Sequence, residues 1–283
     1  MKIPVLPHHR LNKRKPTGFL LLLCLTFAVS CAVLKTYEPK PTLFLIGDST
    51  VKNGRGDGGG GLWGWGSFLA NHFDTTRIKV ENHALGGTSS RTFRTQGHWD
   101  KVLPKVKAGD FVMIQFGHND SSPVNDTLRA RGTIKNNSEE TQEIDNLITK
   151  KQEVVHSYGW YLRQFISEVQ AKGATAIVLS PVPRNTWKDG KANRNRQDYG
   201  QWAAEAAAQM NAPFLDLNGI IADRYEKEGE AKVRSTYFNT KDHTHTIEAG
   251  ARVNAAAVAE GIRQNKKLEL NKYLLKPGRT ARL

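Results

Sequence analysis

The chain has 283 residues and a formal net charge of +14, with 39% hydrophobic and 24% charged residues. This length and balance suit one large folded domain with a buried core, and they argue against a disordered or multi-span membrane protein. The only cysteines, Cys24 and Cys31, lie near the N-terminus. The rest of the chain therefore has no disulfide, thiol nucleophile or cysteine-bound metal.

The first 31 residues have the order of an export signal. Five basic residues come first, the apolar run 18–29 follows, and small residues precede Cys31. We predict residues 1–31 as a signal peptide of an exported protein, located in the periplasm, at the cell surface or outside the cell. The small residues before Cys31 are typical of a lipoprotein site, which predicts a lipid on Cys31; ordinary cleavage nearby and a short uncleaved anchor are the alternatives.

After a linker at 32–41, β-rich apolar runs alternate with helical patterns. Strands are predicted at 42–47, 78–83, 111–116, 175–181 and 214–217. Helices are predicted at 65–73 and 202–210, and around the apolar positions of 161–169 and 253–262. This alternation predicts an α/β fold, a three-layer α/β/α sandwich with a central, mainly parallel five-stranded sheet.

The predicted domain spans 42–266, and 267–283 is predicted to be a loose basic tail. Segment 121–151 is polar and too long for a plain connector, so it is a candidate lid or binding loop.

Polar motifs follow the first three predicted strands, where the carboxyl ends of parallel strands line the ligand crevice of α/β proteins. Ser49 follows the first strand in a Gly-flanked turn that can present its hydroxyl. The paired glycines Gly86 and Gly87 follow the second strand and let a backbone N–H approach a ligand closely. Asn119 follows the third strand and can donate a side-chain N–H to an oxyanion. Each motif alone is ordinary turn chemistry.

A fourth motif, Asp242-His243-Thr244-His245, precedes the last predicted helix. Histidine can take the proton of a serine hydroxyl, and a carboxylate can fix the tautomer of that histidine. A three-residue step across a turn can place Asp242 beside the ring of His245, although the spacing alone does not exclude His243.

In this combination and order, the four motifs resemble the SGNH (GDSL-like) hydrolase superfamily over roughly residues 42–263. The resemblance implies a flavodoxin-like fold, Ser49 as nucleophile, and Asp242 with His245 as its activating pair. It also implies an oxyanion hole made by Ser49, Gly87 and Asn119.

The motifs, together with residues 82–91 and 249–251, are most similar to the rhamnogalacturonan acetylesterase group. This similarity implies removal of acetyl groups from a pectin-type polysaccharide through an acyl-enzyme, without a cofactor. The alternatives are the same chemistry on xylan acetyl esters, acyl lipids or thioesters, and a non-catalytic glycan-binding protein. Segment 121–151 departs from the fungal-type members, which leaves the substrate groove undefined.

The predicted partner is an acetylated acidic polysaccharide, because a basic surface attracts polyanions and an exported protein meets polysaccharide rather than nucleic acid. We expect a monomer that meets a membrane only through a lipid on Cys31. Trp63 and Trp187 are candidates for stacking on sugars, and Arg184 for binding a uronate carboxylate. Trp160 and Trp202 fall in helical patterns and are predicted to be core.

Two further motifs are not assigned a ligand. The Gly-x-Gly-x-x-Gly pattern at 54–59 lies beyond the strand-to-helix turn that a dinucleotide would need, because Asp48 and Ser49 occupy that turn. His243 and His245 alone are too few to hold zinc, so no metal is expected.

Overall fold

The computed structural model describes residues 1–2, 4 and 39–276. Most of the predicted signal peptide, including Cys31, most of the linker and residues 277–283 lie outside the described residues. None of the described helices combines the length and apolar character needed to cross a bilayer.

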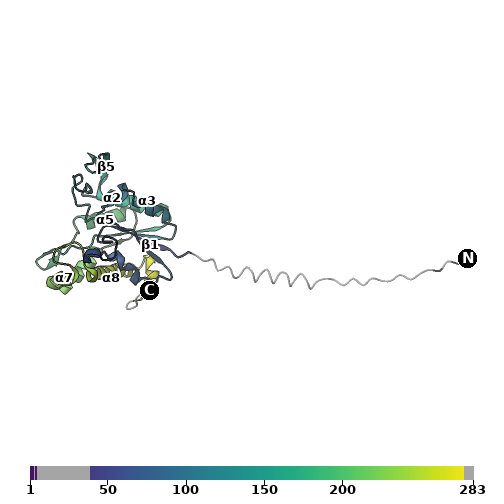
Figure 1. Cartoon of the computed structure of the whole chain (residues 1–283). Coiled ribbons are helices and arrows are strands. Elements are labelled where there is room, and N and C mark those ends of the chain that lie inside the picture. Colours follow the sequence, from purple (N-terminus) through teal and green to yellow (C-terminus); the bar gives the residue numbers. More distant parts are fainter. Residues whose placement is uncertain (3, 5–38, 277–283) are drawn as a thin grey trace. The chain divides into compact units, whose positions relative to one another are not determined.

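The centre of the domain is a five-stranded sheet with the order β2-β1-β3-β6-β9 (Figure 1). All four neighbouring pairs are parallel. The strands are β1 (Thr42–Gly47), β2 (Lys79–Asn82), β3 (Phe111–Gln115), β6 (Thr175–Leu179) and β9 (Phe214–Leu215). The predicted parallel five-stranded sheet is confirmed, with each strand within a few residues of its predicted place.

Two hydrophobic cores cover the two faces of this sheet, since successive side chains of a strand point to opposite faces. In β1, Leu43 and Leu45 belong to one core, and Phe44 and Ile46 belong to the other. The Phe44 face packs against α2 (Ser90–Thr95), α3 (Trp99–Val102), α4 (Tyr158–Ala171) and α5 (Tyr199–Gln209). The Leu45 face packs against α6 (Leu217–Glu228), α7 (Glu230–Tyr237) and α8 (Glu248–Gln264). The three-layer arrangement is therefore confirmed.

The prediction of an α-helix at 65–73 is wrong, because the segment forms 3-10 helices instead. Two 3-10 helices, Trp65–Ser67 and Leu69–His72, occupy it. The Trp65 and Gly66 amides donate to the Thr50 and Val51 carbonyls, at 3.0 and 2.9 Å, and the Phe68 amide donates to the Trp65 carbonyl at 3.1 Å, which is the three-residue step of a 3-10 turn. Further short 3-10 helices lie at Gly59–Gly61 and Leu103–Lys105.

Segment 121–151 is not a plain loop. It contains β4 (Thr141–Asp145), which pairs with β5 (Gln152–His156) as an antiparallel hairpin that projects from the α2 side of the domain (Figure 1). The fully buried Arg91 of α2 anchors it. The Arg91 guanidinium donates two 2.7 Å bonds to the Glu153 carboxylate, and also donates to the carbonyls of Val124 and Gly132. A second small hairpin joins β7 (Trp187–Lys188) and β8 (Lys191–Ala192).

The prediction of a loose tail at 267–283 is wrong for the first residues of that segment. A 3-10 helix spans Glu269–Tyr273, and Leu270 is fully buried in the core on the α8 side. The Leu275 amide donates to the His72 carbonyl at 2.9 Å. The apolar side chains among the basic residues therefore extend the domain past residue 266.

The two predicted core tryptophans are only partly buried. Trp160 stacks on the His156 ring with the ring centroids 3.7 Å apart. Trp202 lies at the margin of the core beside Tyr199.

Candidate active site

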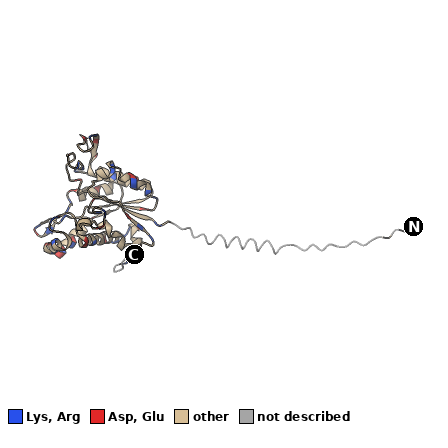
Figure 2. Ribbon diagram, in the orientation of Figure 1, with Lys and Arg blue, Asp and Glu red and all other residues tan. Residues whose placement is uncertain are grey.

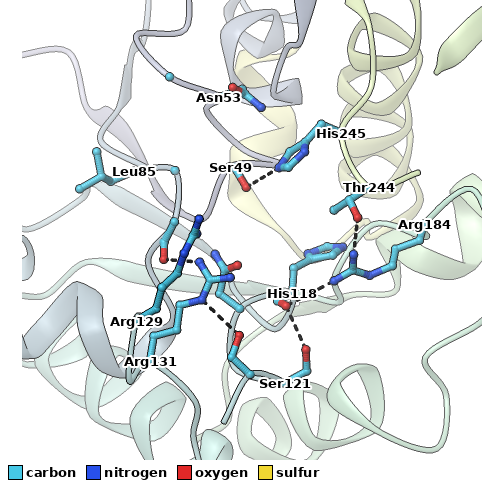
Figure 3. A pocket seen from close by; sticks show the side chains of 15 residues that line it. Ser49, Asn53, Leu85, His118, Ser121, Arg129, Arg131, Arg184, Thr244 and His245 are labelled. Atoms are coloured by element: carbon cyan, nitrogen blue, oxygen red, sulfur yellow. Dashed lines mark hydrogen bonds between the residues drawn. The ribbon is translucent and has the colours of Figure 1, made fainter. Parts of the chain in front are cut away.

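The predicted motifs meet at the carboxyl end of the sheet, where β1 lies between β2 and β3. In a doubly wound sheet this switch in strand order opens a crevice between the loops. A cavity of about 580 Å³ lies there. Ser49 after β1, Gly87 after β2 and Asn119 after β3 line it together with His245 from the loop before α8 (Figure 3).

A hydrogen-bonded relay joins three of the predicted residues. The Ser49 Oγ lies 2.8 Å from Nε2 of His245, and the Nδ1 of His245 lies 2.7 Å from Oδ2 of Asp242. Because a carboxylate accepts at Nδ1, the tautomer with a free lone pair on Nε2 faces the serine hydroxyl. His243 is exposed and does not line the cavity. The geometry therefore distinguishes the two histidines where the spacing did not.

The turn that carries His245 is fixed by Asp242 itself. Its Oδ1 accepts from the backbone N–H groups of Thr244 at 2.7 Å and His245 at 2.9 Å. Burial acts to raise the pKa of Asp242, but these bonds and the His245 ring outweigh it and hold the pKa below its usual value. Two hydrogen bonds tie the same loop to the loop after β1: the Trp63 N–H donates to the Thr246 carbonyl at 2.8 Å, and the Thr246 hydroxyl donates to the Trp63 carbonyl at 3.2 Å.

Three N–H donors belong to residues that line the cavity. The backbone N–H groups of Ser49 and Gly87 have no hydrogen-bond acceptor among the described residues. Gly87 has φ +88°, a conformation that other residues rarely adopt. The Asn119 side chain gives one of its two N–H donors to the Thr88 carbonyl at 2.7 Å, which fixes the amide and leaves the second donor for a ligand. These are the three donors that the sequence analysis predicts for an oxyanion hole.

A lining residue of the cavity, His118, contacts a buried carboxylate. Asp48 is fully buried and accepts from the Thr50 N–H at 2.8 Å and hydroxyl at 2.7 Å. His118, which lines the cavity, places Nδ1 3.3 Å from Asp48 and donates from Nε2 to the Val182 carbonyl at 3.0 Å. Burial acts to raise the pKa of Asp48, but His118 and Thr50 hold it below its usual value. Sequence reasoning did not assign His118 a role.

A second fully buried carboxylate, Asp120, lies behind the same loops. It accepts from the Ser90 hydroxyl at 2.5 Å and from the Gly117 N–H at 3.0 Å. Burial raises the pKa of Asp120 to about 7, with a further contribution from the negative charge of Asp48. These bonds join α2 to the loop after β3, which carries Asn119.

The lining of the cavity includes three arginines, Arg129, Arg131 and Arg184, and no acidic residue (Figure 3). Elsewhere along the described chain, basic and acidic residues are interspersed (Figure 2). Arg184 donates to the Thr244 hydroxyl and to the His118 carbonyl.

Neither tryptophan predicted to stack on sugars lines this cavity. The Trp63 ring covers Gly58 and packs on Phe68, with the centroids 5.0 Å apart. Trp187 lines a separate surface cavity beside Lys188.

Comparison with known proteins identifies the family. The model of the GDSL-like Lipase/Acylhydrolase family matches residues 45–253, which contain the whole relay. This chain belongs to the GDSL-like lipase/acylhydrolase family. It is a carboxylic ester hydrolase, and the predicted superfamily is confirmed.

Two relatives match most of this chain in sequence. The probable rhamnogalacturonan acetylesterase YesY of Bacillus subtilis is 32% identical over 226 residues, which cover 78% of this chain and 92% of YesY. The rhamnogalacturonan acetylesterase of Emericella nidulans is 29% identical over 221 residues, which cover 78% of this chain and 84% of that protein.

Solved structures show the same fold. Protein YxiM of Bacillus subtilis matches with a TM-score of 0.62 and 23% identity, over 80% of this esterase but only 56% of YxiM. The acetylxylan esterase Axe2 of Geobacillus stearothermophilus matches with a TM-score of 0.52 and 19% identity, over 78% of this chain and 94% of Axe2. Among the residues that the structure describes, no group of three or more His, Cys, Asp or Glu side chains is placed to hold a metal ion.

Proposed function

We propose that this esterase removes acetyl groups from a plant cell-wall polysaccharide of the rhamnogalacturonan or pectin type. The chemistry rests on one observation, the continuous relay from Asp242 through His245 to Ser49 at the wall of an open cavity. The assignment of the substrate rests on two relatives that are named as rhamnogalacturonan acetylesterases. It also rests on the arginine-lined cavity, because a basic cavity attracts an acidic sugar chain.

The proposed first half-reaction forms an acetyl-enzyme. Nε2 of His245 takes the hydroxyl proton of Ser49 as Oγ attacks the acetyl carbonyl carbon. The negative charge on the carbonyl oxygen is stabilised by the N–H groups of Ser49 and Gly87 and by the Asn119 amide, each typically worth about 3 kcal/mol in the transition state. The ester C–O bond then breaks, and the sugar oxygen takes the proton back from His245.

The second half-reaction hydrolyses the acetyl-enzyme. His245 takes a proton from water as the water oxygen attacks the acetyl carbon, and the same three donors stabilise the second oxyanion. Acetate leaves when the bond to Ser49 Oγ breaks and His245 returns the proton to the serine. Asp242 keeps the ring oriented and stabilises the imidazolium of both steps. The chain's own residues complete the cycle.

Acetate release from acetylated rhamnogalacturonan tests this function. Acetylated xylan and a long-chain aryl ester serve as competing substrates, and the Ser49→Ala variant measures the background. We expect the highest kcat/KM on the rhamnogalacturonan and no turnover by the variant. Faster release from the xylan or the long-chain ester would assign a different substrate. Binding to pectin without any acetate release would indicate a glycan-binding protein instead.

We also propose that the esterase is exported and lipid-anchored at Cys31. The support is the order of the leader, in which basic residues, an apolar run and small residues precede this cysteine. Expression in a bacterial host should place the full chain in the membrane fraction, and the Cys31→Ala variant should leave it. Equal membrane retention of both proteins would rule out the anchor.

A further inference from the structure

Two arginines of the cavity lie side by side next to the oxyanion donors. The Nη1 atoms of Arg131 and Arg129 lie 3.9 and 4.0 Å from the position that a Cβ on Gly87 would take. Arg131 donates from Nη1 to the Gly87 carbonyl at 2.8 Å and from Nε to the Ser122 hydroxyl at 3.1 Å. Its other guanidinium N–H groups have no acceptor among the described residues. Figure 3 shows both side chains on the same wall of the cavity.

The carboxylates near these two arginines are engaged elsewhere. Asp126 accepts three backbone N–H bonds at one oxygen, from residues 128, 129 and 130, and so holds the turn that carries Arg129. Asp48 and Asp120 are fully buried and bonded to other partners. Neither arginine forms an ion pair within the described chain, whereas Arg91, like several other arginines, does.

Two adjacent guanidinium groups without a counter-ion repel each other, and a bound anion would relieve this repulsion. Burial lowers the pKa of Arg131, and the positive charge of Arg129 lowers it further. A guanidinium presents paired donors that match the two oxygens of a carboxylate. The side chain of Arg129 makes no hydrogen bond within the described chain, so its donors are available to a ligand.

We propose that Arg129 and Arg131 form a binding site for the carboxylate of an acidic sugar, close to the ester that is cleaved. The proposal deepens the proposed function and rests on it, because it specifies how an acetylated uronate would be selected. Arg129 also lines a neighbouring cavity of about 250 Å³ together with Gln96 and Lys151. Arg129 therefore lines both cavities, and in this proposal a longer sugar chain extends from the cavity beside Ser49 toward the second one.

Binding calorimetry on the full chain tests this site without using catalysis. The ligands are an unacetylated galacturonate oligomer and its carboxyl-reduced, neutral counterpart of equal length. The variants are Arg129→Gln and the matched control Arg234→Gln, which removes an exposed arginine that pairs within α7 with Glu230. Since Arg129 makes no side-chain hydrogen bond, its replacement leaves the packing in place, and Arg129→Lys tests charge against fork geometry.

We expect Arg129→Gln to raise the Kd of the acidic oligomer about tenfold or more, because hydrogen bonds to charged groups are the strong ones. Arg129→Lys should give an intermediate Kd, and Arg234→Gln should match the wild type. Added salt should weaken binding of the acidic oligomer but not that of the neutral one. An unchanged Kd in Arg129→Gln, or equal affinity for the two oligomers, would overturn the site.

The experiments distinguish a failure of the carboxylate site from a failure of the proposed function. If acidic oligomers bind through Arg129 but acetylated rhamnogalacturonan releases no acetate, the carboxylate site stands and the proposed substrate is wrong. If acetate is released but Arg129→Gln binds the acidic oligomer as the wild type does, the proposed substrate stands and the carboxylate site is wrong.

Discussion

Replacing Asp242 with asparagine separates orientation from charge in the relay. The Oδ1 atom of Asp242 accepts two backbone N–H bonds, which the carbonyl oxygen of an asparagine can keep. The side chain would then present an NH₂ group where Oδ2 now lies 2.7 Å from Nδ1 of His245. This group can only donate, so it favours the tautomer whose Nε2 carries the hydrogen and cannot take the proton of Ser49.

The expected loss in kcat is about 10⁴-fold, or about 5 kcal/mol of transition-state stabilisation, as for the same change in other Ser-His-Asp enzymes. Hydrolysis of an aryl acetate at neutral pH measures kcat, and chemical denaturation checks that the turn is intact. The free energy of unfolding should change little, because the backbone bonds to Oδ1 survive. A folded variant that loses less than tenfold in kcat would refute a tautomer-fixing role for Asp242.

Three further outcomes are expected. Asn119→Ala should lower kcat about a hundredfold with KM nearly unchanged, because the amide held by Thr88 donates to the oxyanion, and an unchanged kcat would remove it from that role. Arg91→Met should lower the free energy of unfolding by about 3–5 kcal/mol, because it leaves Glu153 unpaired, and protease cleavage within 121–156 should accelerate; a loss below about 1 kcal/mol would contradict the anchor. Asp120 has a pKa of about 7 in the folded protein against an ordinary 3.8, so between these two pH values the folded protein keeps a proton that the unfolded chain loses. The stabilising contribution of Asp120 is therefore complete below pH 3.8 and is lost as the pH rises through about 7. Denaturation of Asp120→Asn from pH 4 to 7 should therefore lack a decline of up to about 4 kcal/mol seen in the wild type, and parallel curves would show that Asp120 is ionised in the folded protein.

The sheet was predictable because each central strand is buried on both faces. Such strands appear in the sequence as short continuous apolar runs, and the loops after them carry the polar motifs. Ser49, Gly87 and Asn119 follow three of these runs, and parallel strands bring their ends to one edge. The family resemblance then selected His245, which the structure places 2.8 Å from the serine hydroxyl.

The predictions that were wrong concern residues whose contacts come from distant parts of the chain. At 65–73 the amides of Trp65 and Gly66 tie the segment to the loop after β1, and a local helical pattern does not include this contact. The Trp63 ring packs on Gly58 and Phe68 rather than lining the cavity, which depends on the path of the glycine-rich loop.

The arginine pair was missed for a similar reason. Segment 121–151 has no apolar periodicity, and its place beside Gly87 depends on Arg91, a residue of a different element. The available signal was the closely spaced Arg129 and Arg131 in a polar segment directly after the Asn119 motif.

The most direct test of the account is covalent labelling of the nucleophile. An aryl phosphonate ester that mimics the tetrahedral intermediate should react once per chain, abolish aryl acetate hydrolysis in proportion, and be found by peptide mass spectrometry on Ser49. The His245→Ala variant should react far more slowly, because the serine then lacks its base. Inactivation with the label on another residue, or undiminished labelling of Ser49 in His245→Ala, would contradict a histidine-activated Ser49.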